Sequence, residues 1–305
     1  MTRSLKAITA EPWAIEPSWL HVLAALARRD LDAEALKRLE GWDRMNLDAV
    51  VANVVVGAAS APPAKLPGAR YASIADGVAI IPVMGPIFPR ANMMTEMSGA
   101  TSVSMLQNDL RLALDNPDVG SIMLLIDSPG GAVAGINAMA DAVYAANKRK
   151  EVIAHVPGAA ASAAYWIASS AKQIMLDKTG QVGSIGVVAA LTKQIQPDTM
   201  GEMTFEIVSS NAPNKRPDPA TEDGQSQIVG MLDDLEALFI ADVARGRGVT
   251  TDKVISDFGQ GGMKVGKGAV SAGMADKVQS QDATFAMARR SAANYRKLQS
   301  MKQDQ

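Results

Sequence analysis

The chain has 305 residues, of which 48% are hydrophobic and 20% are charged, and its formal net charge is -2 at pH 7. This composition is typical of a globular protein with an ample core, and it gives no reason to expect binding to nucleic acid. The absence of cysteine excludes disulfides, thiolate nucleophiles and cysteine-ligated metal sites. With only His21 and His155 as histidines, a multi-histidine metal site is not expected either. We therefore expect neither a metal nor a cofactor.

The N-terminal sequence lacks the apolar core of a secretory signal. The charge-free stretch Val156–Ala171 is too short to span a bilayer. These two observations predict a cytoplasmic protein without a membrane partner.

Composition and periodicity divide the chain into four parts. Apolar residues recur at helical spacing within residues 1–56, which are predicted to form a small helical segment. Residues 57–70 are dense in proline, alanine and glycine and are predicted to be a linker. We expect the main domain over residues 71–280 and a helical or flexible basic tail over residues 281–305.

Short apolar runs alternate with helical patterns along the main domain. The predicted strands are Val78–Val83, Ser121–Ile126, Glu151–Val156, Ile174–Leu176 and Met203–Ser209. The predicted helices cover residues 103–114, 136–143 and 161–170. A longer one carries an apolar stripe from Ile228 to Phe239 and ends within Arg245-Gly246-Arg247-Gly248, where glycine suits a C-cap. The uninterrupted apolar run Ser121–Ile126 is typical of a strand buried on both faces. The alternation predicts an α/β fold with mostly parallel pairing and right-handed crossovers.

Two strand ends carry unusual sequences, and strand ends are where open α/β folds place their sites. The first is the turn Asp127-Ser128-Pro129-Gly130-Gly131. Paired glycines between a strand and a helix leave backbone N–H groups exposed to a ligand, as in an oxyanion hole. A tight turn with a helix cap fits the same residues.

The second strand end is Gly158–Trp166, in which Ser162 is surrounded by alanines near a predicted helix start. Small neighbours allow a substrate to approach closely, and the positive end of a helix dipole favours a developing alkoxide. A serine in this place also fits a simple helix cap.

A serine nucleophile needs a base. His155 stands in the middle of a predicted strand between apolar neighbours, which favours a core histidine, and His21 belongs to the N-terminal segment. A Ser-His-Asp triad is therefore poorly supported, and lysine is the remaining side chain that could act as the base.

The ordered set of motifs from about Ile80 to Val278 resembles the signal peptide peptidase A family of Ser/Lys serine peptidases, which shares the Clp protease/crotonase fold of repeated strand-strand-helix units. The motifs are IDSPGG at 126–131, AAASAAYWIASSA at 159–171, VGSIGV at 182–187, IVSSNAPNK ending at Lys215, and VGKGAVSAGMADKV at 265–278.

The resemblance implies a role for each matching residue. Ser162 matches the nucleophile and Lys215 the general base, while Ser184 matches the hydroxyl that positions the lysine. Gly131, with Gly130 beside it, matches the oxyanion region, and the N–H of Ala163 is a further candidate donor. The family also forms rings with active sites at subunit interfaces, so the resemblance implies that Ser162 and Lys215 can come from different chains.

The opening residues and the segment leading to the double glycine look like the phage branch of this family. That likeness implies a capsid-assembly protease that cleaves scaffold protein inside a procapsid in the host cytoplasm, with portal and capsid proteins as further possible partners. Three alternatives stay open: a soluble bacterial peptidase of the signal-peptide-peptidase type, a crotonase-like acyl-CoA enzyme, and an inactive structural component of a capsid.

Overall fold

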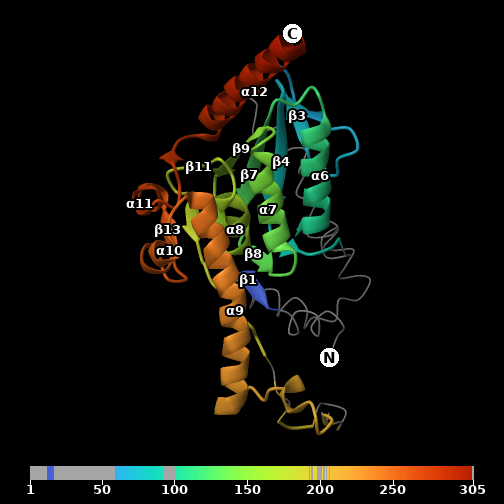
Figure 1. The fold of residues 1–305 in the computed structure, drawn as a ribbon, viewed down its shortest axis with the longest axis vertical. Coiled ribbons are helices and arrows are strands. Elements are labelled where there is room, and N and C mark those ends of the chain that lie inside the picture. The colour runs from blue at the N-terminus through green and yellow to red at the C-terminus, as the bar shows by residue number, and fades with distance from the viewer. Residues whose placement is uncertain are drawn as a thin grey trace.

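The structure is a computed structural model that describes residues 12–16, 59–91, 100–191, 193, 195–197, 201, 203, 205 and 207–303. Its centre is a seven-stranded sheet with the strand order β14-β11-β9-β7-β4-β3-β2 (Figure 1). The strands are β14 (Lys277–Val278), β11 (Gln173–Leu176), β9 (Glu151–Val156), β7 (Ser121–Asp127), β4 (Val78–Met84), β3 (Ser73–Ala75) and β2 (Ala64–Lys65). The pairs from β14 to β4 are parallel, and β3 and β2 extend the edge in antiparallel fashion.

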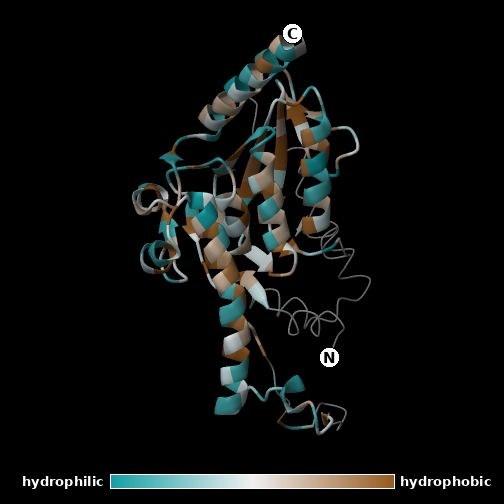
Figure 2. Ribbon diagram, viewed as in Figure 1, coloured by the Kyte–Doolittle hydropathy of each residue, from teal (hydrophilic) through white to brown (hydrophobic). Residues whose placement is uncertain are grey.

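Helices cover both faces of this sheet. The helices α6 (Val103–Asp115), α7 (Ile136–Ala146), α8 (Ala163–Ser169) and α9 (Glu222–Arg247) pack on one face, and α12 (Gln281–Gln303) packs on the other. In β7, Ile122, Leu124 and Ile126 face the first layer, while Met123 and Leu125 face α12. This double burial explains why the strand sequence is apolar without alternation, and Figure 2 shows hydrophobic residues concentrated in the central strands.

Two small sheets stand next to the main one. One has the order β1-β8-β5-β6, with β1 (Trp13–Ile15), β8 (Gly130–Ala132), β5 (Ile87–Phe88) and β6 (Thr101–Ser102). The other has the order β10-β12-β13, with β10 (Ala159–Ala161), β12 (Gln181–Gly183) and β13 (Met263–Val265). The short helices α10 (Thr251–Asp257) and α11 (Gly266–Ala272) flank β13 in the chain.

The chain repeats a unit of long strand, short strand and helix. β7, β8 and α7 form one such unit, and β9, β10 and α8 form the next. The predicted α/β class with repeated strand-strand-helix units of the Clp protease type is confirmed. The predicted strands at residues 78–83, 121–126, 151–156 and 174–176 are all present, and α9 ends at Gly248, which adopts a left-handed conformation with φ of 64°.

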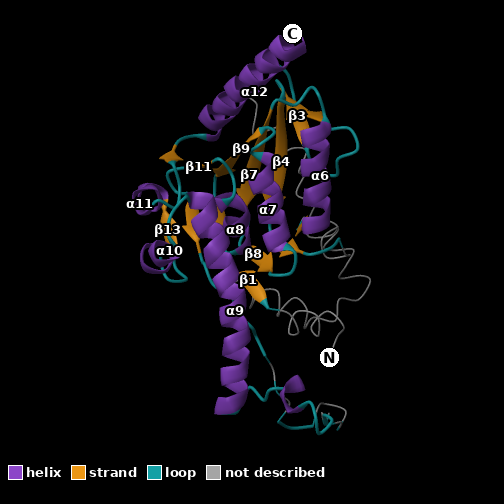
Figure 3. Ribbon diagram, viewed as in Figure 1, coloured by secondary structure: helices purple, strands orange, loops and turns teal. Residues whose placement is uncertain are grey.

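The predicted strand Met203–Ser209 is wrong, because none of its described residues belongs to a strand (Figure 3). Phe205 is 77% exposed and Ile207 is 93% exposed. The apolar alternation resembles that of a strand, but no strand in the described part of the chain pairs with it.

Residues 12–16 lie in the segment that was expected to be helical, and Trp13–Ile15 instead form strand β1. The rest of that segment, including the helix expected around Trp19 to Leu26, lies outside the described residues. Among the helices that the structure describes, none is both long and apolar enough to cross a membrane.

Candidate active site

Ser162 lies between β10 and α8 with a strained backbone. Its φ is 51°, a value that few residues other than glycine adopt. Its N–H donates a hydrogen bond to the Gly183 carbonyl oxygen at 2.7 Å. The side chain is fully buried, and its Oγ has no hydrogen-bond partner among the described residues. Ser162 occupies the N-cap position of α8, but its hydroxyl makes no capping hydrogen bond, so capping does not explain this serine.

Ser184 lies beside Ser162 at the end of the neighbouring strand. β10 and β12 are parallel, with Ala161 opposite Gly183, so the two serines are the next residues of paired strands. Neighbouring strands are roughly 4.8 Å apart. Ser184 also has a positive φ, 54°, and its N–H donates to the Gly262 carbonyl oxygen at 3.0 Å. The structure therefore brings together two buried serines that are 22 residues apart in the sequence.

Gly130 and Gly131 complete this side of the site. A side chain at Gly130 would need a Cβ 2.3 Å from the Ala14 carbonyl oxygen and 3.0 Å from the Ser162 Cβ, at a φ of 99°. A Cβ at Gly131 would lie 1.9 Å from the Ile87 carbonyl oxygen. Both positions thus require glycine, and Gly130 packs directly against the candidate nucleophile. Ala163 is the first residue of α8, where N–H groups have no acceptor within the helix.

Two residues of the glycine turn, Asp127 and Ser128, hold it against β10, a role that was not predicted for them from the sequence. Ser128 and Ala159–Ala161 are joined by backbone hydrogen bonds, from the Ser128 N–H to the Ala159 oxygen at 2.7 Å and from the Ala161 N–H to the Ser128 oxygen at 3.0 Å. The Ser128 hydroxyl donates to the Gly85 oxygen at 2.7 Å and accepts from the Gly130 N–H at 3.2 Å. Asp127 accepts from the Ala159 N–H at 2.9 Å. Their position in the DSPGG motif was the only signal for this role.

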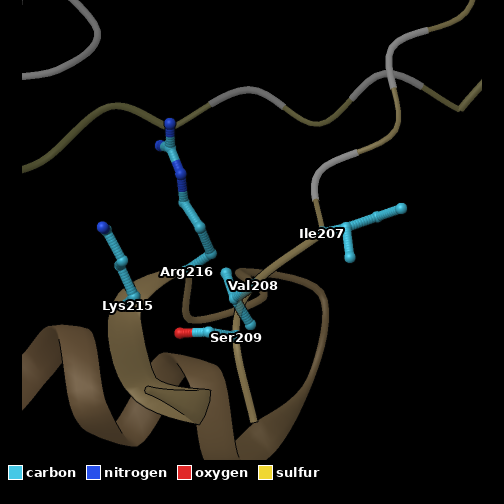
Figure 4. A pocket seen from close by; sticks show the side chains of 5 residues that line it. All are labelled: Ile207, Val208, Ser209, Lys215 and Arg216. Carbon is cyan, nitrogen blue, oxygen red and sulfur yellow. The ribbon is translucent and has the colours of Figure 1, made fainter. Parts of the chain in front are cut away.

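Lys215 lies outside this cluster. It ends the short 3-10 helix η1 (Pro213–Lys215) and is exposed. Together with Ile207, Val208, Ser209 and Arg216 it lines a shallow hollow, and Figure 4 shows its amine pointing away from the chain. This segment leads into the N-terminal end of α9, which projects from the body of the molecule in Figure 1.

The length of α9 shows how far Lys215 is from Ser162. Phe239 of α9 stacks on Trp166 of α8, with ring centroids 4.4 Å apart, and this contact fixes the far half of α9 to the body. The 17 residue steps from Glu222 to Phe239 span about 26 Å at 1.5 Å per residue. The described residues of one chain therefore do not bring Ser162 and Lys215 together.

His155 is a residue of β9, and its side chain faces α12 in the core. Its side chain is fully buried, and Nδ1 is 3.0 Å from the Thr284 hydroxyl. Nε2 is 3.6 Å from an oxygen of Asp177, and burial lowers the pKa of His155 to about 4. These contacts identify a core histidine, whereas His21 lies outside the described residues.

Comparison with known proteins agrees with this arrangement. The profile of peptidase family S49 matches residues 145–295, and that of Clp protease matches residues 87–179. The chain is 28% identical over 285 residues to "Capsid assembly protease C" of Escherichia phage lambda, with 91% of this chain and 63% of that protein covered. It is 27% identical to "Head-tail preconnector protein GP5" of Enterobacteria phage P21 over 94% of this chain and 58% of that protein.

A cellular protease matches as well. "Protease 4" of Haemophilus influenzae is 26% identical over 69% of this chain and 34% of that protein. The chain thus spans less than two thirds of the length of each of these three relatives. The S49 match includes Ser162, Ser184 and Lys215, and the Clp match includes Gly130 and Gly131. Through these matches residues 145–295 are similar to peptidase family S49, on a fold of the Clp protease type.

Proposed function

We propose that this protein is a serine endopeptidase in which Ser162 is the nucleophile and Lys215 is the general base. The observation that carries the proposal is the Ser162 hydroxyl, which is buried, held on a strained backbone and left without a hydrogen-bond partner among the described residues. Strain of this kind clusters at functional sites, where the surrounding structure maintains it. The family match supports a peptidase over the crotonase-like and structural alternatives.

The roles follow from the chemistry of acyl transfer. The hydroxyl of Ser162 attacks the substrate carbonyl while the lysine amine accepts its proton. The N–H groups of Gly131 and Ala163, in the Gly130-Gly131 turn and at the start of α8, stabilise the oxyanion, and each such donor contributes on the order of 3 kcal/mol to the transition state. The proton then passes from the lysine to the leaving amine, and water repeats the sequence to release the acyl group.

A lysine acts as a base near neutral pH only when its pKa falls from ~10.4 to roughly 7, which corresponds to a free-energy difference of about 5 kcal/mol in favour of the neutral amine. Burial without a carboxylate partner lowers the pKa in this way. A hydroxyl such as that of Ser184 orients the amine without stabilising its charge as a carboxylate would, which is the positioning role that we assign to it.

We infer that the base reaches Ser162 from a neighbouring subunit of a homo-oligomeric ring. Two observations support this: Lys215 lies at the projecting end of α9, and both the segment before η1 and α9 itself expose apolar side chains. The exposed apolar residues are Leu191, Ile195, Met203, Phe205, Ile207 and Val208 before η1, and Val229, Met231 and Leu238 along α9. Apolar exposure of this extent is typical of a protein–protein interface.

We further propose that the substrate is a scaffold protein and that cleavage occurs during capsid assembly within a procapsid in the host cell. Support comes from the names of the two phage relatives, which align with more than nine tenths of this chain. The names of the same two relatives support the proposal that portal and capsid proteins are further partners.

Mixing two inactive variants tests the mechanism. Ser162→Ala and Lys215→Ala are purified separately, then mixed in equal amounts under conditions that let subunits exchange, and hydrolysis of fluorescent casein is measured. Each variant alone should be inactive. The mixture should regain about a quarter of the wild-type activity, because half of the subunits keep Ser162 and half of their neighbours keep Lys215.

Labelling with a fluorophosphonate probe checks the nucleophile independently. Wild-type protein should be labelled and Ser162→Ala should not. Full activity of Lys215→Ala alone would remove this lysine from the mechanism. If Lys215→Ala is inactive but the mixture recovers nothing despite confirmed subunit exchange, the base comes from the same chain.

A further inference from the structure

Strand β1 runs through the candidate active site as an added strand. It pairs antiparallel with β8, so that Trp13 lies opposite Ala132 and Ile15 opposite Gly130. At the two ends of this pairing, the Glu16 N–H donates to the Pro129 oxygen at 2.8 Å and the Val133 N–H donates to the Pro12 oxygen at 3.2 Å. In an antiparallel ladder every second residue pair is hydrogen-bonded. Ala14 and Gly131 lie midway between the two bonded ends, so they also form a hydrogen-bonded pair.

The other edge of β1 is also hydrogen-bonded. Trp13 and Val188 exchange two backbone hydrogen bonds, at 2.9 Å from the Trp13 N–H and 2.8 Å from the Val188 N–H. Val188 is four residues beyond Ser184. β1 therefore fills a slot between β8 on one side and the segment from Ser184 to Val188 on the other.

The backbone of β1 also passes close to the candidate nucleophile. The Ala14 carbonyl oxygen and the Ser162 Cβ lie 2.3 Å and 3.0 Å from the same point, the Cβ position that Gly130 leaves empty. The two atoms are thus no further apart than the sum of these distances. A peptide carbonyl is held here next to a serine that is itself fully buried.

Side chains on alternate positions anchor β1. Trp13 and Ile15 are buried in a small apolar cluster with Phe88, Ala100 and Ala132, against which Val188 packs. The rings of Trp13 and Phe88 meet edge to face, with centroids 6.0 Å apart. Ala14, between the two large residues, belongs to the main core instead. The slot thus accepts large apolar side chains at two alternate positions and a small one between them.

A peptidase binds its substrate as an extended strand, through main-chain hydrogen bonds and pockets for alternate side chains. β1 has each of these features and brings a carbonyl group to the serine. Resting on the proposed peptidase function, we propose that β1 is an internal occupant of the substrate-binding groove, which holds the enzyme closed until an extended polypeptide displaces it. The preferred polypeptide has bulky apolar residues two positions apart around a small one.

A reversible lock on β1 tests this. Because the chain has no cysteine, Trp13→Cys with Ala132→Cys creates a single disulfide between residues that lie opposite each other, at a separation that suits the bond. The pair is introduced into the full chain together with Ser162→Ala, so that the measurement needs no catalysis. The probe is a fluorescein-labelled peptide AEPWAIEPS, the sequence of residues 10–18, and binding is followed by fluorescence anisotropy.

The reduced protein should bind the peptide, and the oxidised protein should bind it at least tenfold more weakly, with recovery after reduction. Trp13→Cys alone should respond to neither oxidant nor reductant, and a peptide with proline in place of Ala14 should bind poorly because it lacks an N–H for the ladder. Circular dichroism of the oxidised form checks that it is folded.

Equal binding by the oxidised and reduced proteins would overturn the proposal, and so would absence of binding by the reduced protein, because an extended peptide with the native sequence should displace β1 once the disulfide is open. Since the nucleophile is absent throughout, these outcomes are independent of whether Ser162 cleaves peptides. Failure of the peptidase proposal would appear separately, as absence of casein hydrolysis by the wild-type protein, because an extended polypeptide such as casein can displace β1.

Discussion

The backbone N–H of Ser162 donates to the carbonyl oxygen of Gly183 at 2.7 Å, and Gly183 directly precedes Ser184. This hydrogen bond continues the parallel pairing of β10 and β12 by one residue and joins the two places where the backbone turns into positive φ. The position of the candidate nucleophile is therefore set by the strand that carries the second serine.

Replacing Ser162 with alanine should abolish hydrolysis. The expected loss is roughly 10⁴-fold or more in kcat, because the covalent step disappears. The measurement is casein hydrolysis with the thermal transition recorded in parallel. Ser170→Ala is the matched control, since Ser170 is also buried without a hydrogen-bond partner among the described residues but lies at the other end of α8. An equal loss in both variants would point to a structural effect instead.

Replacing Ser184 with alanine should lower kcat by roughly 10²-fold with little change in KM, as expected when a catalytic group is misplaced. The acid limb of the pH profile of kcat/KM should also move to higher pH, because a lysine that has lost its orienting hydroxyl is harder to deprotonate in place. Ser73→Ala is the control, since Ser73 has the same 7% exposure in strand β3. An unchanged pH profile would argue against a positioning role.

Gly131→Ala should destabilise the protein by at least about 2 kcal/mol, because the added methyl group overlaps a backbone oxygen that cannot move without its strand. Gly230→Ala is the opposite case, since Gly230 is exposed within α9 and has open space around its Cβ position. That change should stabilise the chain by about 0.5–1 kcal/mol. Urea unfolding of both variants compares the two free energies, and equal values would refute the packing described for the glycine turn.

His155 should make stability depend on pH. Its pKa is about 4 in the folded protein and ~6.5 in the unfolded chain, so the unfolded state binds the additional proton between these values. Stability from this group is therefore complete above pH 6.5 and falls as the pH drops towards 4, by up to about 3 kcal/mol. Comparing the free energy of unfolding of wild type and His155→Gln from pH 7 to pH 4 measures the difference.

Asp177 faces the same imidazole at 3.6 Å, and burial raises its pKa, so its own contribution has the opposite sign near pH 4. The comparison is therefore repeated in an Asp177→Asn background. If His155→Gln leaves the pH dependence unaltered in both backgrounds, the histidine does not titrate as its burial requires.

Much of the fold was predictable because the signals are local. β7 and β9 are apolar runs buried between two helical layers, and Gly248 marks the end of α9 with a conformation that glycine readily adopts. The proximity of Ser162 and Ser184 was implied by family resemblance, and its physical basis is the parallel register of Ala161 and Gly183.

The remaining features depend on partners distant in sequence. Trp13–Ile15 has too few residues to show a strand pattern, and it becomes a strand only through pairing with β8 and Val188. Ile207 and Phe205 have the apolar alternation of a strand, but no strand of the described chain pairs with them. The position of Lys215 likewise depends on how far α9 extends from the body, which no local motif encodes.

If Ser162 and Lys215 pair between subunits as proposed, the length of α9 sets the distance between them. Its 26 residues fix how far the lysine of one subunit reaches towards the serine of the next. Each residue added to or removed from the free half would shift the lysine by about 1.5 Å and rotate it by roughly 100° about the helix axis. A newly made subunit would then hold half of a catalytic site, and proteolysis would begin only once the ring has closed.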